Sequence, residues 1–231
     1  MQAAVTPPAT LPIWREGVIA ARANLLPGLF LWALALAVVS GYYLWPSMNN
    51  ALGAVARIKS EWGFLYSFLA TMVFGGLIPF IWFRLRGIVA AKGQIKVFLF
   101  FALFWGYRGI EVDALYHLQS LIFGNGTDAF TVFRKVLVDM FIYNVIWASG
   151  LQTIAYHWKD QGFSSHAFTG MDWRKLFTRR IPVTIIATWG VWIPVVAIVY
   201  SLPSDLQIPL FNIAICFWVL VVSTLTKPKT A

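Results

Sequence analysis

Residues 105 to 139 read WGYRGIEVDALYHLQSLIFGNGTDAFTVFRKVLVD, and they place charged side chains inside apolar sequence. A short polar turn at residues 124 to 128 divides the stretch into two apolar segments. An ionisable side chain in a membrane costs about 2.5 to 3.5 kcal/mol on insertion and is usually paired or faces water. We therefore expect the two segments to supply a polar interior around which the other apolar segments pack. The polar residues that could line a pore or lie buried there are Arg108, Glu111, Asp113, His117, Gln119, Lys135 and Asp139, with Asn212 near the end of the chain.

The composition is that of a membrane protein. Of the 231 residues, 59% are hydrophobic and only 12% are charged, whereas about a quarter of a soluble domain is charged. The chain also contains 12 Trp and 19 Phe, and its apolar runs approach the ~20 residues that cross a bilayer. These features predict an all-α, polytopic integral membrane helical bundle.

The apolar runs predict six transmembrane helices, at residues 25–45, 62–83, 97–122, 132–157, 182–202 and 206–226. They form one transmembrane domain, residues 25–226, between a polar N-terminal segment (1–24) and a short basic tail (227–231). Prolines argue against a long helix at the start, and no removable signal peptide is expected. The longest loop, residues 159–180, is too short for a soluble domain.

The net charge of +9 is a topology signal. With six spans, most of the Lys and Arg residues fall on one side of the membrane, which the positive-inside rule assigns to the cytoplasm. Both termini are therefore expected in the cytoplasm, and a nucleic-acid partner is not expected. The residues on that side are Arg15, Arg22, Arg84, Arg86, Lys92, Lys96, Lys159, Arg174, Lys175, Arg179, Arg180, Lys227 and Lys229.

The sequence offers little support for an enzyme. It lacks G-x-S-x-G, a phosphate-binding glycine loop and H-E-x-x-H. The single cysteine, Cys216, excludes an internal disulfide and a cysteine-cluster metal site. The three histidines are scattered; His117 and Asp113, four apart, could hold a metal or form a hydrogen-bonded pair. We expect no catalytic residue, no cofactor and no metal.

Helical spacing predicts which residues share a face. Ser67, Thr71 and Gly75 recur every four residues, a ridge that lets helices approach closely. Arg108 and Glu111, three apart, can form an ion pair. Two arrangements are open for Lys135 and Asp139, which are four apart. They can form an ion pair within the helix, or Asp139 can contact a partner on another helix, because lysine ahead of the acid is the weaker order for such a pair. If the fourth span is an α-helix, one face of it carries a stripe of eight residues, namely Lys135, Asp139, Ile142, Ile146, Ser149, Gly150, Thr153 and His157.

Several short motifs stand out along the chain, among them Lys135-x-x-x-Asp139, Asp172-Trp-Arg-Lys-Leu176 and Trp189-x-x-Trp192. Together these motifs resemble the family of the mitochondrial inner-membrane protein Mpv-seventeen and the peroxisomal membrane channel proteins. The resemblance covers residues 62–226 and departs from the family at Leu77 and Met140, where the family has an acidic residue and a glutamine. Its remaining landmarks, which look like packing and interface residues, are Gly109, Tyr116, Pro194, Pro203 and Trp218.

The resemblance implies a divergent bacterial member, a multi-pass protein of the inner membrane, and a weakly selective channel for small solutes. Our first hypothesis is therefore a small-solute channel or pore, lined by the third and fourth spans, with a small solute or ion as its partner in the lipid bilayer. The second is a non-transporting structural or assembly protein whose buried polar residues fix helix pairing. A homo-oligomer or a membrane protein partner fits either hypothesis.

Overall fold

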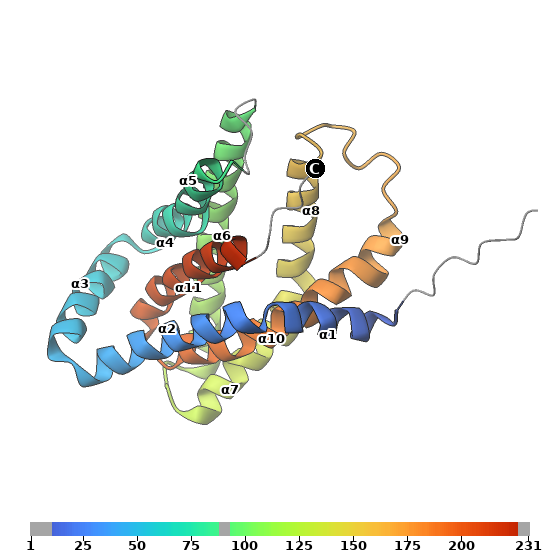
Figure 1. Cartoon of the computed structure of the whole chain (residues 1–231). Helices are drawn as coiled ribbons and strands as arrows, with labels where there is room; N and C mark the ends of the chain where they lie inside the picture. Colours follow the sequence, from blue (N-terminus) through green and yellow to red (C-terminus); the bar gives the residue numbers. More distant parts are fainter. Residues whose placement is uncertain (1–10, 88–92, 226–231) are drawn as a thin grey trace, which may run out of the picture.

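In the computed structural model, the described residues are 11–87 and 93–225, and all of their regular secondary structure is helical (Figure 1). Outside the described residues lie the predicted basic tail, the first ten residues of the predicted N-terminal segment, and Lys92. Each of the six predicted spans coincides with helix, to within a few residues. The predicted all-α class is therefore confirmed.

Four helical segments are long and apolar enough to cross a membrane. The first is α2 (Leu25–Leu44), and the second combines α4 (Phe64–Thr71), the π-helix η1 (Met72–Leu77) and α5 (Ile78–Leu85). The third combines α9 (Trp173–Lys175), the π-helix η3 (Leu176–Arg180) and α10 (Ile181–Tyr200), and the fourth is α11 (Ser204–Leu225). The chain is a helical membrane protein.

The two charged segments are also long helices, although they are not among these four. The first is α6 (Gln94–Phe123), and the second runs through α7 (Ala129–Leu137), the π-helix η2 (Val138–Ala148) and α8 (Ser149–Asp160). Asp128 caps α7 by accepting hydrogen bonds from the backbone N–H groups of Phe130 and Thr131. Hydrogen bonding from Thr131 holds the pKa of Asp128 below its usual range. In Figure 1, α7 lies at the bottom, and the helix rises from it through η2 to α8.

Two further helices were not anticipated from the sequence. The short helix α1 (Ile13–Ala23) begins directly after Pro12 and packs against α10, so closely that a Cβ on Gly17 would lie 2.6 Å from Cβ of Ile186. The helix α3 (Pro46–Trp62) joins α2 to α4 and ends at Gly63, whose φ of 54° favours glycine. Because α3 follows the end of α2, it brings Lys59 into the protein interior.

The predicted close approach along Ser67, Thr71 and Gly75 is confirmed. Ser67 and Thr71 are fully buried, and the ridge packs against α6. A Cβ on Gly109 of α6 would lie 2.1 Å from the carbonyl oxygen of Ser67, so only glycine fits there. On the opposite side of the contact, a Cβ on Gly75 would lie 2.9 Å from the Trp105 ring. This contact fixes the second predicted span against α6.

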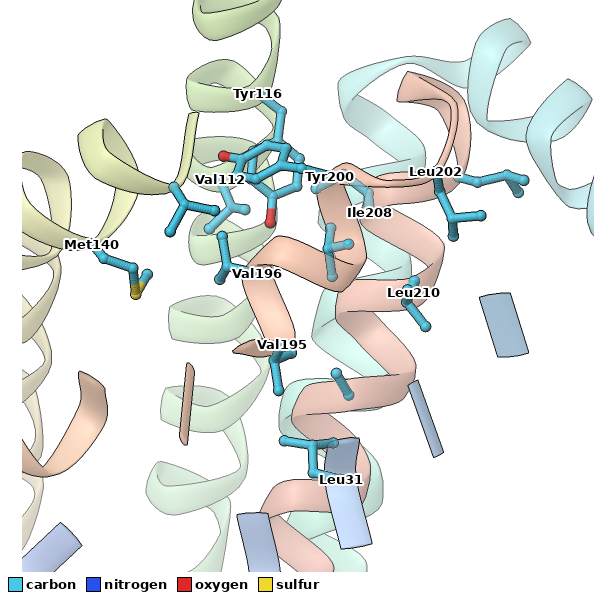
Figure 2. Close-up of a cluster of buried hydrophobic side chains, with 14 of the residues drawn as sticks. Leu31, Val112, Tyr116, Met140, Val195, Val196, Tyr200, Leu202, Ile208 and Leu210 are labelled. Carbon is cyan, nitrogen blue, oxygen red and sulfur yellow. The ribbon is translucent and has the colours of Figure 1, made fainter. Parts of the chain in front are cut away.

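The main apolar core lies where α6, η2, α10, α11 and α2 meet (Figure 2). Val112 and Tyr116 of α6 face Val196 and Tyr200 of α10, and Met140 of η2 reaches toward them. The rings of Tyr116 and Tyr200 meet edge to face with centroids 5.0 Å apart, a favourable arrangement for an aromatic pair. Residues of this core also line the space between α6 and η2.

Candidate functional site

A cavity of about 730 Å³ lies between α6 on one side and η2 and α8 on the other. Residues of α10 and α11 form much of the remaining wall, and the core residues Val112, Tyr116, Met140 and Val196 line part of it. The wall is completed by Ala20, Asn24, Gly75 and Phe83. Its volume falls in the range of pockets that hold small molecules, about 300 to 1,000 Å³. The polar residues of its wall are Asn24, Arg108, Tyr116, Asp139, Tyr143, Asn144, Ser149, Gln152, Thr153, Tyr156, Thr184 and Thr188.

The π-helix η2 brings polar residues to the cavity that an α-helical phase would separate. In a π-helix the backbone hydrogen bonds join residues five apart, so residues five apart share a face. Asp139, Asn144 and Ser149 are spaced by five, all line the cavity, and the Ser149 hydroxyl donates to Oδ1 of Asn144 at 2.8 Å. The sequence contained this signal as three polar residues at a spacing of five.

The predicted stripe on the fourth span was therefore wrong in its middle. It placed Ile142 and Ile146 on the inner face with Asp139, but these side chains are 52% and 74% exposed. The π-helical register turns both isoleucines outward, toward the lipid in a membrane, and turns Tyr143, Asn144 and Ala148 inward instead.

The predicted ion pair of Arg108 and Glu111 is confirmed. Nη1 of Arg108 lies 2.6 Å from Oε1 of Glu111, and both side chains are largely buried. The hydroxyl of Tyr143 on η2 donates to the same carboxylate oxygen, and the Arg108 guanidinium lies 5.7 Å from the centre of the Tyr143 ring. These contacts fix the guanidinium on the cavity wall and link α6 to η2.

Asp139 finds its partner on another helix. The Tyr200 hydroxyl of α10 donates to Oδ2 of Asp139 at 2.8 Å, and Nε2 of Gln119 donates to the Tyr200 oxygen at 2.9 Å. The Lys135 ammonium lies 5.7 Å from the centre of the Tyr200 ring. Within the described part of the chain, no ion pair joins Lys135 to Asp139. Of the two arrangements left open by the sequence, the structure has the interhelical one.

The other predicted polar residues lie away from this cavity. Asp113 forms an ion pair of 3.0 Å with Lys59 of α3 and accepts a hydrogen bond of 2.7 Å from Ser67. Asn212 accepts a hydrogen bond of 2.7 Å from Thr71. His117 is exposed on α6, with its ring against Phe64. Among the described residues, no group of three or more His, Cys, Asp or Glu could hold a metal ion.

Two of the eight predicted polar residues, Arg108 and Asp139, therefore line the cavity. Glu111 borders it through its contacts with Arg108 and Tyr143. Gln119 and Lys135 contact Tyr200, which in turn donates to the lining residue Asp139. Sequence reasoning missed Tyr143, Asn144 and Gln152 as lining residues.

Most of the residues that carry the family resemblance contact residues of other helices. Gly109 lies against the Ser67 backbone, Tyr116 contacts Tyr200, and Nε1 of Trp189 donates to the carbonyl oxygen of Met140 at 2.8 Å. Trp192 and Trp218 line the cavity with ring centroids 6.3 Å apart. Pro194 lies inside α10, and Pro203 lies between α10 and α11.

No protein-family model, curated protein or solved structure matches the chain.

Proposed function

We propose that this membrane protein takes a small solute into the cavity between α6 and η2 and passes it across the membrane. The observation that carries the proposal is the cavity itself, which combines about 730 Å³ of space with charged and amide side chains among apolar helices. The family resemblance points in the same direction.

We extend the proposal to topology: α6 and the helix from Ala129 to Asp160 also cross the membrane, giving six spans with both termini in the cytoplasm. Arg108, Glu111 and Asp113 are ion-paired, and Asp139 accepts a hydrogen bond from Tyr200, which lowers the cost of inserting these charges. The α6–α7 turn would then lie outside the cytoplasm. The side from which an impermeant reagent labels a cysteine at Asn125 tests this topology.

A structural or assembly role is the alternative, and one observation favours it. Outside the cavity, some buried polar residues contact each other across helices, as in the Lys59–Asp113–Ser67 group and the Thr71–Asn212 pair. Such contacts stabilise helix pairing without any ligand. A protein partner that co-purifies stably, together with absent solute flux, would support this alternative.

The test of transport is solute flux in reconstituted vesicles. Vesicles that contain the protein should equilibrate glycerol faster than protein-free vesicles, as followed by light scattering after rapid mixing. Ala148→Trp should return the rate to that of protein-free vesicles, because Ala148 is buried and lines the cavity. The indole would fill the space through which the solute passes.

The matched control is Ala114→Trp, because Ala114 lies on an exposed face of α6 and not at the cavity. This variant should retain the wild-type flux. Equal rates for wild-type and protein-free vesicles would contradict transport of this solute class, and equal inhibition by both variants would remove the cavity from the pathway.

A further inference from the structure

We propose that a second pocket, near the end of α8, binds a phosphate group that is carried by a lipid headgroup or by a soluble phosphate ester. The pocket has a volume of about 320 Å³ and is formed by the end of α8, the loop of residues 161–172 and residues of α9 and η3 (Figure 1). Among the described residues it shares none with the cavity between α6 and η2, so the inference does not rest on solute transport.

Two cations on one helical face supply the positive charge of this pocket. Lys175 directly precedes η3 and Arg180 is its last residue, and residues five apart share a face of a π-helix. Both line the pocket, and neither forms an ion pair within the described part of the chain. Arg174 and Arg179 have the same spacing but do not line the pocket, and Arg179 is paired with Glu16 of α1. The four basic residues are therefore divided between two faces, and only one of these faces meets the pocket.

The rest of the pocket is polar, and its loop is tied to α8. Nε2 of His157 donates to the carbonyl oxygen of Ala167 at 3.0 Å. Asp172 is the one carboxylate among the described lining residues, and it accepts a backbone hydrogen bond of 2.8 Å as the cap of α9. His166 and Thr169, whose side chains can donate hydrogen bonds, also line the pocket. Two cations beside one carboxylate favour an anion, and a phosphate has enough acceptor oxygens to engage several donors at once.

An aromatic surface beside the pocket favours a lipid as the carrier of the phosphate. The rings of Phe168, Trp173 and Phe177 form a continuous stack, with neighbouring centroids 6.0 and 6.2 Å apart. The stack begins at the pocket, because the Phe168 ring lies 6.0 Å from that of the lining residue His157. Trp173 and Phe177 are exposed at the start of a helical segment that is long and apolar enough to cross a membrane. Aromatic and basic residues at the end of a span are typical of the level of the lipid headgroups.

The probes are dioctanoyl phosphatidate and glycerol 3-phosphate, which share a phosphate monoester and differ in the acyl chains. Dioctanoylglycerol, which has the chains but no phosphate, is the control ligand. Each is titrated into the purified protein in detergent micelles, binding is measured by calorimetry, and the signal from protein-free micelles is subtracted. We expect saturable binding of the phosphatidate, binding of glycerol 3-phosphate that is at least about tenfold weaker, and no saturable binding of dioctanoylglycerol.

Single substitutions test the role of the two cations. Lys175→Gln and Arg180→Gln each remove one charge from the pocket and should weaken binding of the phosphatidate by about tenfold. The control is Arg174→Gln, which removes an equal charge from a neighbouring residue outside the pocket and should change binding less than about twofold. All three side chains are exposed, so the substitutions should leave the fold intact, which thermal unfolding of the variants without ligand verifies.

Binding that is weakened in Lys175→Gln and Arg180→Gln but retained in Arg174→Gln supports the inference. Equal affinities for glycerol 3-phosphate and the phosphatidate would also support a phosphate site, and would assign it to a soluble ester rather than a lipid. The inference is overturned if neither phosphate ligand binds saturably, or if dioctanoylglycerol binds as tightly as the phosphatidate. Equal weakening by all three substitutions would also overturn it, because general attraction to a basic surface would then explain the binding.

Discussion

Asp113→Asn should lower the free energy of unfolding by about 3 to 5 kcal/mol, because it leaves the Lys59 ammonium buried without its counter-charge. Lys59 and Asp113 are each less than 5% exposed, and their charged atoms lie 3.0 Å apart. Replacing both partners, as Lys59→Met with Asp113→Leu, should recover much of the loss, since neither charge then remains buried. Thermal unfolding of the purified protein in one detergent measures the three variants.

The control for this pair is Asp160→Asn. Asp160 is paired with Lys159 at the end of α8, but its side chain is 62% exposed. Exposed pairs contribute about 0 to 1 kcal/mol, so this substitution should leave the unfolding temperature nearly unchanged. If Asp113→Asn is as well tolerated as Asp160→Asn, the ion pair between α3 and α6 does not exist in the folded protein.

Gly109→Ala should be strongly destabilising, although it adds one methyl group to a helix. That methyl would lie 2.1 Å from the carbonyl oxygen of Ser67 and 2.6 Å from Oγ1 of Thr71. A backbone oxygen cannot move aside as a flexible side chain can, so α6 and α4 would have to separate. Overpacking of this kind costs about 1 to 3 kcal/mol and occasionally more, and we expect the upper part of this range. The measurement is again thermal unfolding in detergent.

Gly53→Ala provides the matched control, because a Cβ at Gly53 of α3 would meet no heavy atom within 4 Å. Alanine there should raise stability slightly, since glycine in a helix costs about 0.5 to 1 kcal/mol relative to alanine. Opposite effects at the two glycines are expected. A stability gain at both would mean that α4 and α6 do not approach as closely as described.

The features of the fold that could be predicted from the sequence are those carried by local composition and spacing. The four apolar helices follow from runs of hydrophobic residues, and the approach of α4 to α6 follows from Ser67, Thr71 and Gly75 at a spacing of four. Arg108 and Glu111 were expected to pair because residues three apart on a helix are neighbours.

Features that depend on distant contacts or on a change of helix type could not be predicted in the same way. Lys59 falls between the first two predicted spans, and the path of α3 brings it to Asp113, 54 positions later in the sequence. The inner face of the fourth span was misplaced because an α-helical phase was applied to residues that form a π-helix. The composition of Val138–Ala148 does not by itself distinguish the two helix types, although the spacing of Asp139, Asn144 and Ser149 fits the π-helix.

The most direct test of a water-accessible cavity facing η2 is the labelling of single cysteines in membranes. In a Cys216→Ala background, cysteines at Asn144, Ala148 and Ile146 are treated with a small, charged methanethiosulfonate reagent. The first two residues line the cavity, whereas Ile146 is two positions from each and points outward. Cysteines at 144 and 148 should react rapidly, and one at 146 should react slowly, because a thiol that faces lipid rarely ionises. Rapid reaction at 146 with protection at 144 and 148 would contradict both the π-helical register and the cavity.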